Sequence, residues 1–321
     1  MTEVTLPQRF TAQPLFQPAT EALRFLPECP RVLQHRPGHL GWIAIQHSAA
    51  STSGSLNVLN LATLENREYP LPGRPGFFAE TKTPGLLLVG MERRLVLYDL
   101  NTSTLRETGV TVTSDERVII NDGVPVPGGV VFGTKHVAFS ETIAKLYFFS
   151  VATRGIKELA GGQICSNGKF FRADERKLVD VDSSPKTITE YEFRPDWSVL
   201  SQRLITPPAA LPAIPDGLRP TPDGHSVIVC FYNPDSKADG LAQEIGIADG
   251  AVLAEWTLPG SPRVTCPEFF LRDGRVCLLF TTAVEGMPDE ERVTAPEAGA
   301  LFWAATGFAT LPAPPPLLDM E

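Results

Sequence analysis

Residues 214–233 read IPDGLRPTPDGHSVIVCFYN, and residues 243–260 read QEIGIADGAVLAEWTLPG. Each stretch holds two short runs of strand-forming residues around a turn rich in Pro, Asp, Gly or Ala. This is the pattern of a β-hairpin. Together the two stretches predict four consecutive antiparallel strands. The same four-strand unit recurs along the chain, and this repetition decides the fold.

Both hairpins of the unit have six copies. The copies of the second hairpin are SLNVLNLATLENREYPLPG (55–73), RLVLYDLNTSTLRETGV (94–110), KLYFFSVATRGIKELAGG (145–162), TITEYEFRPDWSVLSQRLI (187–205), the quoted 243–260 and ALFWAATGFATLPAP (300–314). The copies of the first hairpin are ECPRVLQHRPGHLGWIAIQ, FFAETKTPGLLLVG, INDGVPVPGGVVFGT, CSNGKFFRADERKLVDVD, IPDGLRPTPDGHSVIVCFY and VTCPEFFLRDGRVCLLFTT. They predict an all-β fold, a six-bladed β-propeller with four antiparallel strands per blade. We expect one domain over residues 1–321, with its core at about 28–315 and with residues 1–27 as a segment that could close the ring.

The composition of the chain indicates which kinds of molecule it is expected to bind. The chain has 43% hydrophobic and 20% charged residues and a formal charge of −9. This charge argues against nucleic acid as a partner, and no apolar run approaches the roughly 20 residues of a membrane span. The N-terminus lacks a secretory pattern, and the five cysteines include no CxxC pair. We therefore expect a cytoplasmic protein with reduced thiols and a small-molecule partner.

Oxygen-bearing side chains stand at equivalent points of four repeats. The first strand of each blade of a propeller lines the central channel, and four of these strands begin with Glu28, Asn121, Asn167 and Asp216. Two carboxylates and two carboxamides aimed at one point would repel one another without a cation between them. Hard oxygen donors favour Ca²⁺ over Mg²⁺, Mn²⁺ or Zn²⁺. The competing interpretation is that NDG, SNG and PDG are ordinary turns.

The tripeptide Pro-Asp-Gly occurs twice in the opening stretch. The second copy, residues 222–224, separates GLRPT from HSVIVCFY, so Asp223 is expected in a hairpin turn. The first copy, residues 215–217, falls where the chain enters the channel strand. Asp216 is therefore expected at one mouth of the channel.

The order of these motifs resembles the senescence-marker-protein, gluconolactonase and luciferin-regenerating-enzyme family, which includes regucalcin and the bacterial sugar lactonases. The resemblance runs from Glu28 to about Trp303, and NDGVPVPGGVVFGTK, IPDGLRPTPDG and VTCPEFF…CLLFTTA carry it. It implies a propeller with one divalent metal held by Glu28, Asn167 and Asp216. It also implies that Asn121 contacts the substrate and that Asp216 is the general base.

The sequence departs from the family pattern at three points. Ile119 stands where many lactonases have an arginine, and VPVPGG lacks the aspartate expected after the NDG motif. Phe269 and Phe270 replace a Gly-Gly pair. The metal site is therefore better supported than specificity for a sugar lactone.

Three inserts connect the second and third strands of their blades, at 133–144, 232–243 and 283–299. Such loops should surround the mouth that holds the metal, where specificity is commonly set. His136 and Glu141 in the first insert are candidates for substrate contact, with a plain loop role as the alternative.

These observations favour a metal-dependent hydrolase that opens a lactone or related ester. The cation would polarise the carbonyl and lower the pKa of a bound water, while Asp216 accepts its proton. Two alternatives stay open. One is a phosphotriesterase-like propeller, which the apolar replacements Ile119, Phe269 and Phe270 would suit, and the other is a calcium-binding or ligand-binding propeller without turnover.

Overall fold

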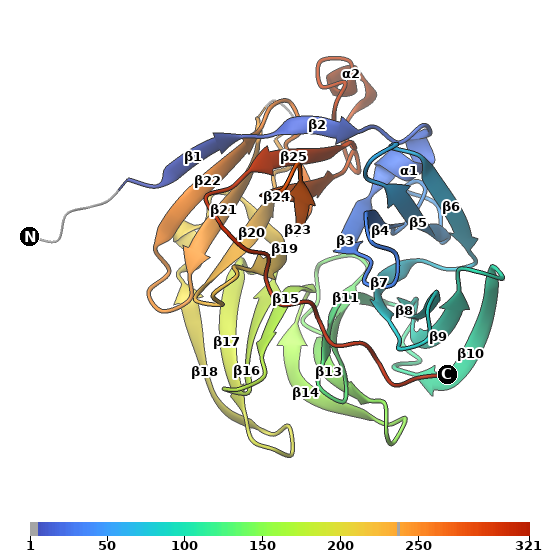
Figure 1. Cartoon of the computed structure of the whole chain (residues 1–321). Helices are drawn as coiled ribbons and strands as arrows, with labels where there is room; N and C mark the ends of the chain where they lie inside the picture. Colours follow the sequence, from blue (N-terminus) through green and yellow to red (C-terminus); the bar gives the residue numbers. More distant parts are fainter. Residues whose placement is uncertain (1–5, 236–237) are drawn as a thin grey trace, which may run out of the picture.

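The computed structural model describes residues 6–235 and 238–321. These residues form six sheets around a central axis, as Figure 1 shows, and the first strands of neighbouring blades contact one another around that axis. The prediction of a six-bladed β-propeller with four antiparallel strands per blade is confirmed.

In the first five blades the strands follow the chain from the channel outward. The first three blades are β3 (Pro27–Val32), β4 (His39–Ala44), β5 (Gly54–Asn60) and β6 (Asn66–Leu71); β7 (Pro75–Glu80), β8 (Leu86–Met91), β9 (Arg94–Asp99) and β10 (Thr104–Thr111); and β11 (Val118–Val126), β12 (Gly129–His136), β13 (Ala144–Ser150) and β14 (Ile156–Gln163). The next two are β15 (Ser166–Arg172), β16 (Lys177–Asp182), β17 (Thr187–Phe193) and β18 (Val199–Thr206); and β19 (Ile214–Pro220), β20 (Ser226–Tyr232), β21 (Gly240–Gly246) and β22 (Val252–Leu258).

The sixth blade takes its strands from both ends of the chain. It contains β23 (Val264–Arg272), β24 (Arg275–Thr282), β25 (Leu301–Ala305) and, as its outer strand, β2 (Gln13–Phe16), which pairs antiparallel with β25. A further strand, β1 (Gln8–Thr11), pairs parallel with β22 of the fifth blade. The N-terminal segment thus links the last two blades, at the top of Figure 1.

The expectation of a second strand within ALFWAATGFATLPAP (300–314) is wrong. Only Leu301–Ala305 is a strand there, and β2 occupies the outer position. Four prolines follow between residues 312 and 316. Proline has no N–H to give to a ladder, so this segment cannot continue the sheet.

Helical segments are short. They are α1 (Glu21–Phe25), the 3₁₀ turn η1 (Pro208–Ala210) and α2 (Asp289–Arg292). Within the described ranges, no helix has the length and apolar character needed to cross a membrane.

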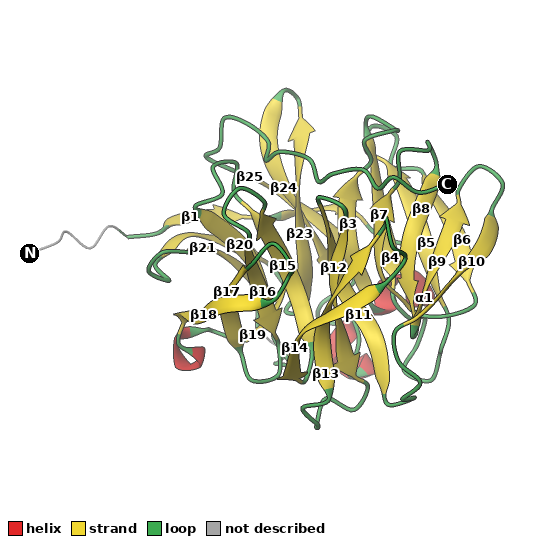
Figure 2. Cartoon of the chain, turned by 90° about the horizontal axis from the view of Figure 1, so that it is seen from below, coloured by secondary structure: helices red, strands yellow, loops and turns green. Residues whose placement is uncertain are grey.

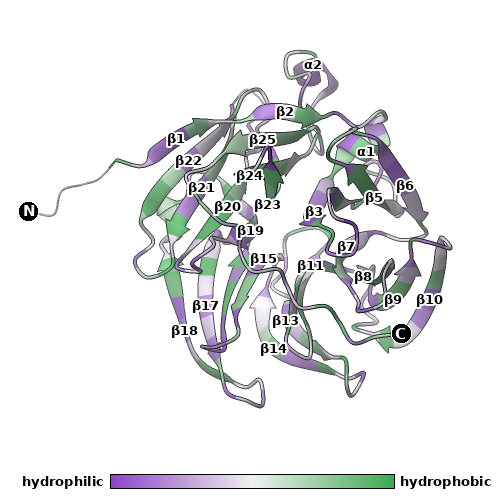
Figure 3. Ribbon diagram, in the orientation of Figure 1, coloured by the Kyte–Doolittle hydropathy of each residue, from purple (hydrophilic) through white to green (hydrophobic). Residues whose placement is uncertain are grey.

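Apolar side chains fill the space between neighbouring blades. The middle strand β8 is buried along its whole length, whereas the outer strand β10 is mostly exposed. Between the second and third blades, the ring of Phe77 packs 5.7 Å from that of Phe132, centroid to centroid. Figure 3 shows the same division, with hydrophobic residues on inner strands such as β8 and hydrophilic ones on outer strands such as β6. Burial between blades makes the channel wall a rigid scaffold.

The innermost strands, β3, β7, β11, β15, β19 and β23, all run in the same direction along the axis. We call the end where they begin the first mouth and the end where they finish the second mouth. The C-terminal tail, residues 306–321, crosses the second mouth, as Figures 1 and 2 show. It is fixed beside β7, where the backbone N–H of Leu318 donates to the carbonyl oxygen of Glu80 at 3.0 Å.

Candidate metal centre

A cavity of about 260 Å³ lies at the first mouth. Glu28, Asn121, Asn167 and Asp216 all line it, from β3, β11, β15 and β19 respectively. Residues from four blades, separated by up to 188 positions in the chain (216 − 28), thus face one space. The expected convergence at the channel mouth is present.

Each of the four innermost strands that carry these residues, β3, β11, β15 and β19, changes register near its cavity residue. The ladder is interrupted between Glu28 and Arg31 in β3, and between Ile120 and Gly123 in β11. It is also interrupted at residues 166–169 of β15 and 215–218 of β19. A β-bulge leaves a residue unpaired and turns its side chain away from the regular alternation. These bulges explain how strands that line the channel can direct polar groups into the cavity.

The glycines that follow these residues do not form turns. Gly123, Gly168 and Gly217 lie inside strands and are absent from the positions with positive φ. A Cβ atom on Gly168 would lie 2.4 Å from the backbone nitrogen of Leu218, and one on Gly217 would lie 2.6 Å from Sγ of Cys266. Glycine is therefore required by the close approach of neighbouring blades. The turn interpretation of NDG, SNG and the first PDG does not hold.

Three carboxyl groups of the described residues line the cavity, and the ionised forms of two of them, Glu28 and Asp216, are disfavoured. Burial, and then the charge of Asp216, raise the pKa of Glu28 well above its ordinary value. Burial raises the pKa of Asp216 to about 8, and the nearby Lys135 opposes this shift. Desolvation and like charge both penalise two ionised carboxylates at such a site. A cation between them would remove both penalties.

The two asparagines use their amide nitrogens for protein contacts. Asn167 Nδ2 donates to Asp216 Oδ1 and, at 3.1 Å, to Ser183 Oγ. Asn121 Nδ2 donates to the backbone oxygen of Ser166 at 3.1 Å. This arrangement leaves the carboxamide oxygens of both residues for a ligand in the cavity.

The set of oxygen donors fits a hard divalent cation. Two buried carboxylates and two carboxamide oxygens match the ligands that Ca²⁺ uses. The described part of the chain contains no group of three or more His, Cys, Asp or Glu side chains suited to a metal. A site here would therefore depend on the asparagines as well as on Glu28 and Asp216.

His136 and Glu141 lie outside the residues that line this cavity. The His136 ring is buried, and its Nδ1 accepts from the backbone N–H groups of Ser140 and Glu141 at 3.2 and 2.9 Å. The Glu141 carboxylate is exposed and pairs with Arg117 at 2.9 Å. Both residues hold the 133–144 insert in place. Phe139 of the same insert does line the cavity.

The other inserts also reach the first mouth. Glu285, in the insert 283–299, lines the cavity, and Tyr232 beside it donates its hydroxyl to the backbone oxygen of Glu285 at 2.8 Å. The middle of the 232–243 insert, Ser236 and Lys237, falls outside the described residues. The inserts therefore supply part of the rim.

Sequence reasoning missed Lys135. It is the only basic residue among the described residues that line the cavity, and it stands near both Glu28 and Asp216. Lys135 lies near the end of β12, opposite Ile119. A signal was present in the sequence. The second strand of a blade ends at the mouth where the first strand begins, and Lys135 comes directly after the apolar run GGVVFGT.

The substitutions at 119, 269 and 270 do not change this cavity. Ile119 is buried and does not line it. Phe269 lines a separate cavity at the second mouth, and Phe270 packs in the core with Leu40 and Trp42. The expectation that these apolar residues suit a hydrophobic substrate at the metal is wrong, because β23 directs Phe269 and Phe270 elsewhere.

The sequence and the fold both have known relatives. Residues 26–284 match the family model described as SMP-30/Gluconolactonase/LRE-like region. An L-arabinolactonase from Azospirillum brasilense is 28% identical over 244 residues, covering 75% of this chain and 77% of that protein.

Solved structures share the architecture. The calcium-binding protein regucalcin from Agrobacterium tumefaciens superposes with a TM-score of 0.81 at 19% identity, covering 98% of this chain and 100% of the other. A luciferin-regenerating enzyme gives 0.78 at 16% identity, with coverage of 96% and 100%. A gluconolactonase from Xanthomonas campestris gives 0.65 at 13% identity, with coverage of 94% and 99%. At such identities these structures support the fold alone. The match of the family model over most of the chain shows that it belongs to the SMP-30/Gluconolactonase/LRE-like family.

Proposed function

We propose that this protein is a divalent-metal-dependent hydrolase that opens a lactone or a related ester. The observation that carries the proposal is the common cavity of Glu28, Asn167 and Asp216. The family includes relatives named for lactones, the L-arabinolactonase of A. brasilense and the gluconolactonase of X. campestris. Lactone opening is therefore the reaction class that site and family support together.

Glu28, Asn167 and Asp216 would hold the metal, with Ca²⁺ as first choice. The donors are oxygen atoms, which favour Ca²⁺ or Mg²⁺ over softer ions. A related structure is that of a calcium-binding protein. Zn²⁺, Mg²⁺ and Mn²⁺ are the alternatives that a titration separates.

A bound divalent cation would polarise the ester carbonyl and acidify nearby water. Asp216 would take the proton from the attacking water and pass it to the ring oxygen as the C–O bond breaks. The carboxamide of Asn121 would orient the carbonyl or the water. Lys135 would stabilise the negative charge that develops on the carbonyl oxygen, because it is the one basic residue among the described residues that line the cavity.

Chelation and metal return test the proposal on wild-type protein. After treatment with EDTA, hydrolysis of a panel of aldonolactones should fall to background, and one of Ca²⁺, Mg²⁺, Mn²⁺ or Zn²⁺ should restore it. Undiminished lactone hydrolysis after complete metal removal would contradict the proposal. Turnover of aryl phosphotriesters alone would support the phosphotriesterase alternative, and metal binding without turnover would support a binding protein.

We also propose a cytoplasmic location. All five cysteines are free thiols and all are buried. Reduced cysteines are typical of proteins in the cytosol. The formal charge of −9 supports a small-molecule partner over nucleic acid or an anionic membrane surface.

A further inference from the structure

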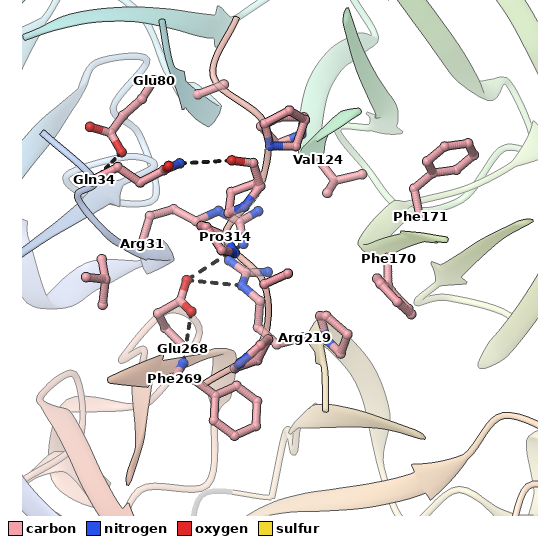
Figure 4. A pocket seen from close by; sticks show the side chains of 18 of the residues that line it. Arg31, Gln34, Glu80, Val124, Phe170, Phe171, Arg219, Glu268, Phe269 and Pro314 are labelled. Atoms are coloured by element: carbon pink, nitrogen blue, oxygen red, sulfur yellow. Dashed lines mark hydrogen bonds and ion pairs between the residues drawn. The ribbon is translucent and has the colours of Figure 1, made fainter. Parts of the chain in front are cut away.

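A second cavity, of about 620 Å³, lies at the second mouth. All six innermost strands contribute to its lining, with residues that follow those at the first mouth. Among them are Arg31, Phe78, Val124, Phe170, Arg219 and Glu268. Residues 311–316 of the C-terminal tail complete the lining. Figure 4 shows the tail passing over the channel between these strands.

The two cavities are separate sites. They have no lining residue in common among the residues that the structure describes. Asp216 opens β19 at the first mouth, whereas Arg219 lies three residues further along the same strand at the second cavity. A ligand at one mouth therefore contacts different side chains from a ligand at the other.

Most of the second cavity is apolar. Phe170 and Phe171 from β15 form one side of it, and Phe269 from β23 forms another, as Figure 4 shows. The tail adds Leu311, Pro312 and Pro314. Proline rings have no N–H to donate, so the ring surfaces in this part of the wall pack against hydrocarbon, while the backbone carbonyl oxygens remain acceptors. Contacts of this kind suit the apolar body of a small molecule.

The polar part of the cavity includes an arginine–glutamate cluster. Glu80 and Lys169 also line the cavity, but Glu80 accepts from the backbone N–H of Gln34 at 2.7 Å and Lys169 pairs with Asp180 at 3.0 Å. Glu268 Oε2 lies 3.3 Å from Nε of Arg219 and 3.8 Å from a terminal nitrogen of Arg31. One carboxylate is thus shared by two guanidinium groups. The net charge of this cluster is +1 in a protein whose formal charge is −9.

Arg31 has donors to spare. Arg219 directs its terminal nitrogens to the backbone oxygens of Leu218 and Pro30, at 2.6 and 3.0 Å, in addition to Glu268. By contrast, within the described residues Arg31 makes one hydrogen bond, from a terminal nitrogen to the backbone oxygen of Gly123 at 3.2 Å, beside its 3.8 Å ion pair with Glu268. Its side chain is 11% exposed. A guanidinium with five donors and one bond can bind a carboxylate with two parallel hydrogen bonds.

The C-terminal side of the tail is fastened to the first two blades. Gln34 Nε2 donates to the backbone oxygen of Pro315 at 2.9 Å, as drawn in Figure 4. Beyond it, the Leu318 side chain is buried, and Lys82 pairs with Asp319 at 2.9 Å. A tail fastened this way limits the occupant to a small molecule rather than a peptide.

We propose that the second cavity binds a small amphipathic monocarboxylate. Its carboxylate would bind Arg31, and its hydrocarbon body would pack between Phe170, Phe171 and the prolines of the tail. This site goes beyond the proposed hydrolase function and does not depend on it, since the metal ligands lie at the other mouth.

Calorimetric titration with octanoate, and with 1-octanol as a neutral match, tests the site. Wild-type protein should bind octanoate at least tenfold more tightly than 1-octanol. Arg31→Met should remove this preference while changing the affinity for 1-octanol by less than about twofold. Arg106→Met, which removes an exposed arginine on the outer strand β10, is the matched control and should behave as wild type.

Two further variants keep the test decisive. Val124→Trp should weaken both ligands by filling the cavity, and Asp216→Asn should leave octanoate binding unchanged. The proposal is overturned if wild-type protein shows no preference for octanoate, if folded Arg31→Met keeps the preference, or if the ligand is lost with Asp216→Asn.

Discussion

The two Pro-Asp-Gly tripeptides are seven residues apart in one blade, and the structure uses them in opposite ways. In residues 215–217 the aspartate is buried in strand β19 and lines the candidate metal centre. In residues 222–224 the aspartate is exposed in the turn between β19 and β20. The same three residue types thus give a site residue at one end of a strand and a turn at the other. Position in the blade decides which.

The glycines differ for the same reason. Gly224 has a φ of +70°, and a Cβ added there would be 3.6 Å from the Phe170 ring, an ordinary contact. Gly217 lacks positive φ, but its missing side chain makes room for Cys266 of the next blade. One glycine is required by backbone conformation and the other by packing.

The largest difference between substitutions of the two aspartates should appear in catalytic activity. Asp216→Asn should lower kcat/KM on a lactone substrate by about 10³-fold or more, because it removes a metal ligand and the proposed base together. Asp223→Asn should change it by less than about twofold. Initial rates at saturating metal measure both. Equal losses in the two variants, or full activity in folded Asp216→Asn, would contradict the assignment.

Alanine substitutions at the two glycines should lower the free energy of unfolding by different amounts. Gly217→Ala would force a Cβ atom to within 2.6 Å of Cys266 Sγ, so the free energy of unfolding should fall by about 2–3 kcal/mol. Gly224→Ala meets no close atom and should cost about 1 kcal/mol through backbone strain alone. Urea denaturation of the two variants beside wild type provides the comparison. A smaller loss for Gly217→Ala than for Gly224→Ala would refute the packing explanation.

The two aspartates should also give opposite pH dependence in metal-free protein. Burial raises the pKa of Asp216 from 3.8 to about 8, so the folded protein binds a proton that the unfolded chain releases. Its unfolding free energy should therefore fall as the pH rises between these values. The backbone N–H of His225 lowers the pKa of Asp223, so its stabilising contribution is present above pH 3.8 and is lost as the pH falls below that value.

Urea midpoints at pH 5 and pH 8, in the presence of EDTA, test this difference. The midpoint of wild type should be lower at pH 8, Asp216→Asn should reduce that fall, and Asp223→Asn should leave it unchanged. The part that persists in Asp216→Asn is attributed to Glu28, whose pKa is also raised by burial. An identical pH response of wild type and Asp216→Asn would show that Asp216 is not protonated in the folded state.

The smallest effect is expected at the turn itself. Asp223 Oδ1 accepts from Thr221 Oγ1 at 2.8 Å and from the backbone N–H of His225 at 3.0 Å. Asp223→Ala should lower the free energy of unfolding by roughly 0.5–1 kcal/mol and leave kcat/KM unchanged. A loss of activity in this variant would mean that the two ends of β19 are coupled.

The number of blades and the number of strands in each could be predicted from the sequence, because hairpin patterns recur along the chain. For ring closure the sequence indicated residues 1–27 as a whole but not the pairing: the prolines after Ala305 end the sheet, and the partner strand, Gln13–Phe16, comes from the far end of the chain. Pairing between such distant segments leaves no local signal. The tail over the second mouth was missed for the same reason, since the backbone of Leu318 pairs with Glu80 and Lys82, more than 230 residues earlier.

Within the site, the repeat position predicted which side chains meet, but not how they are directed. The bulges that turn Asn167 and Asp216 toward the cavity depend on the register of neighbouring strands, which composition does not reveal. His136 and Glu141 were chosen for their chemistry, yet local hydrogen bonds hold them in their own loop. Lys135 carried a signal, a charge at the end of an apolar strand, that the repeat pattern could have identified.

Calorimetric titration of Ca²⁺ into EDTA-treated protein is the most direct test of the metal centre. We expect one ion bound per chain in wild type and binding at least tenfold weaker in Glu28→Gln, with Asp223→Asn unchanged. If wild type binds no divalent cation, or if Glu28→Gln binds it as tightly as wild type, the three oxygen donors do not form a metal site.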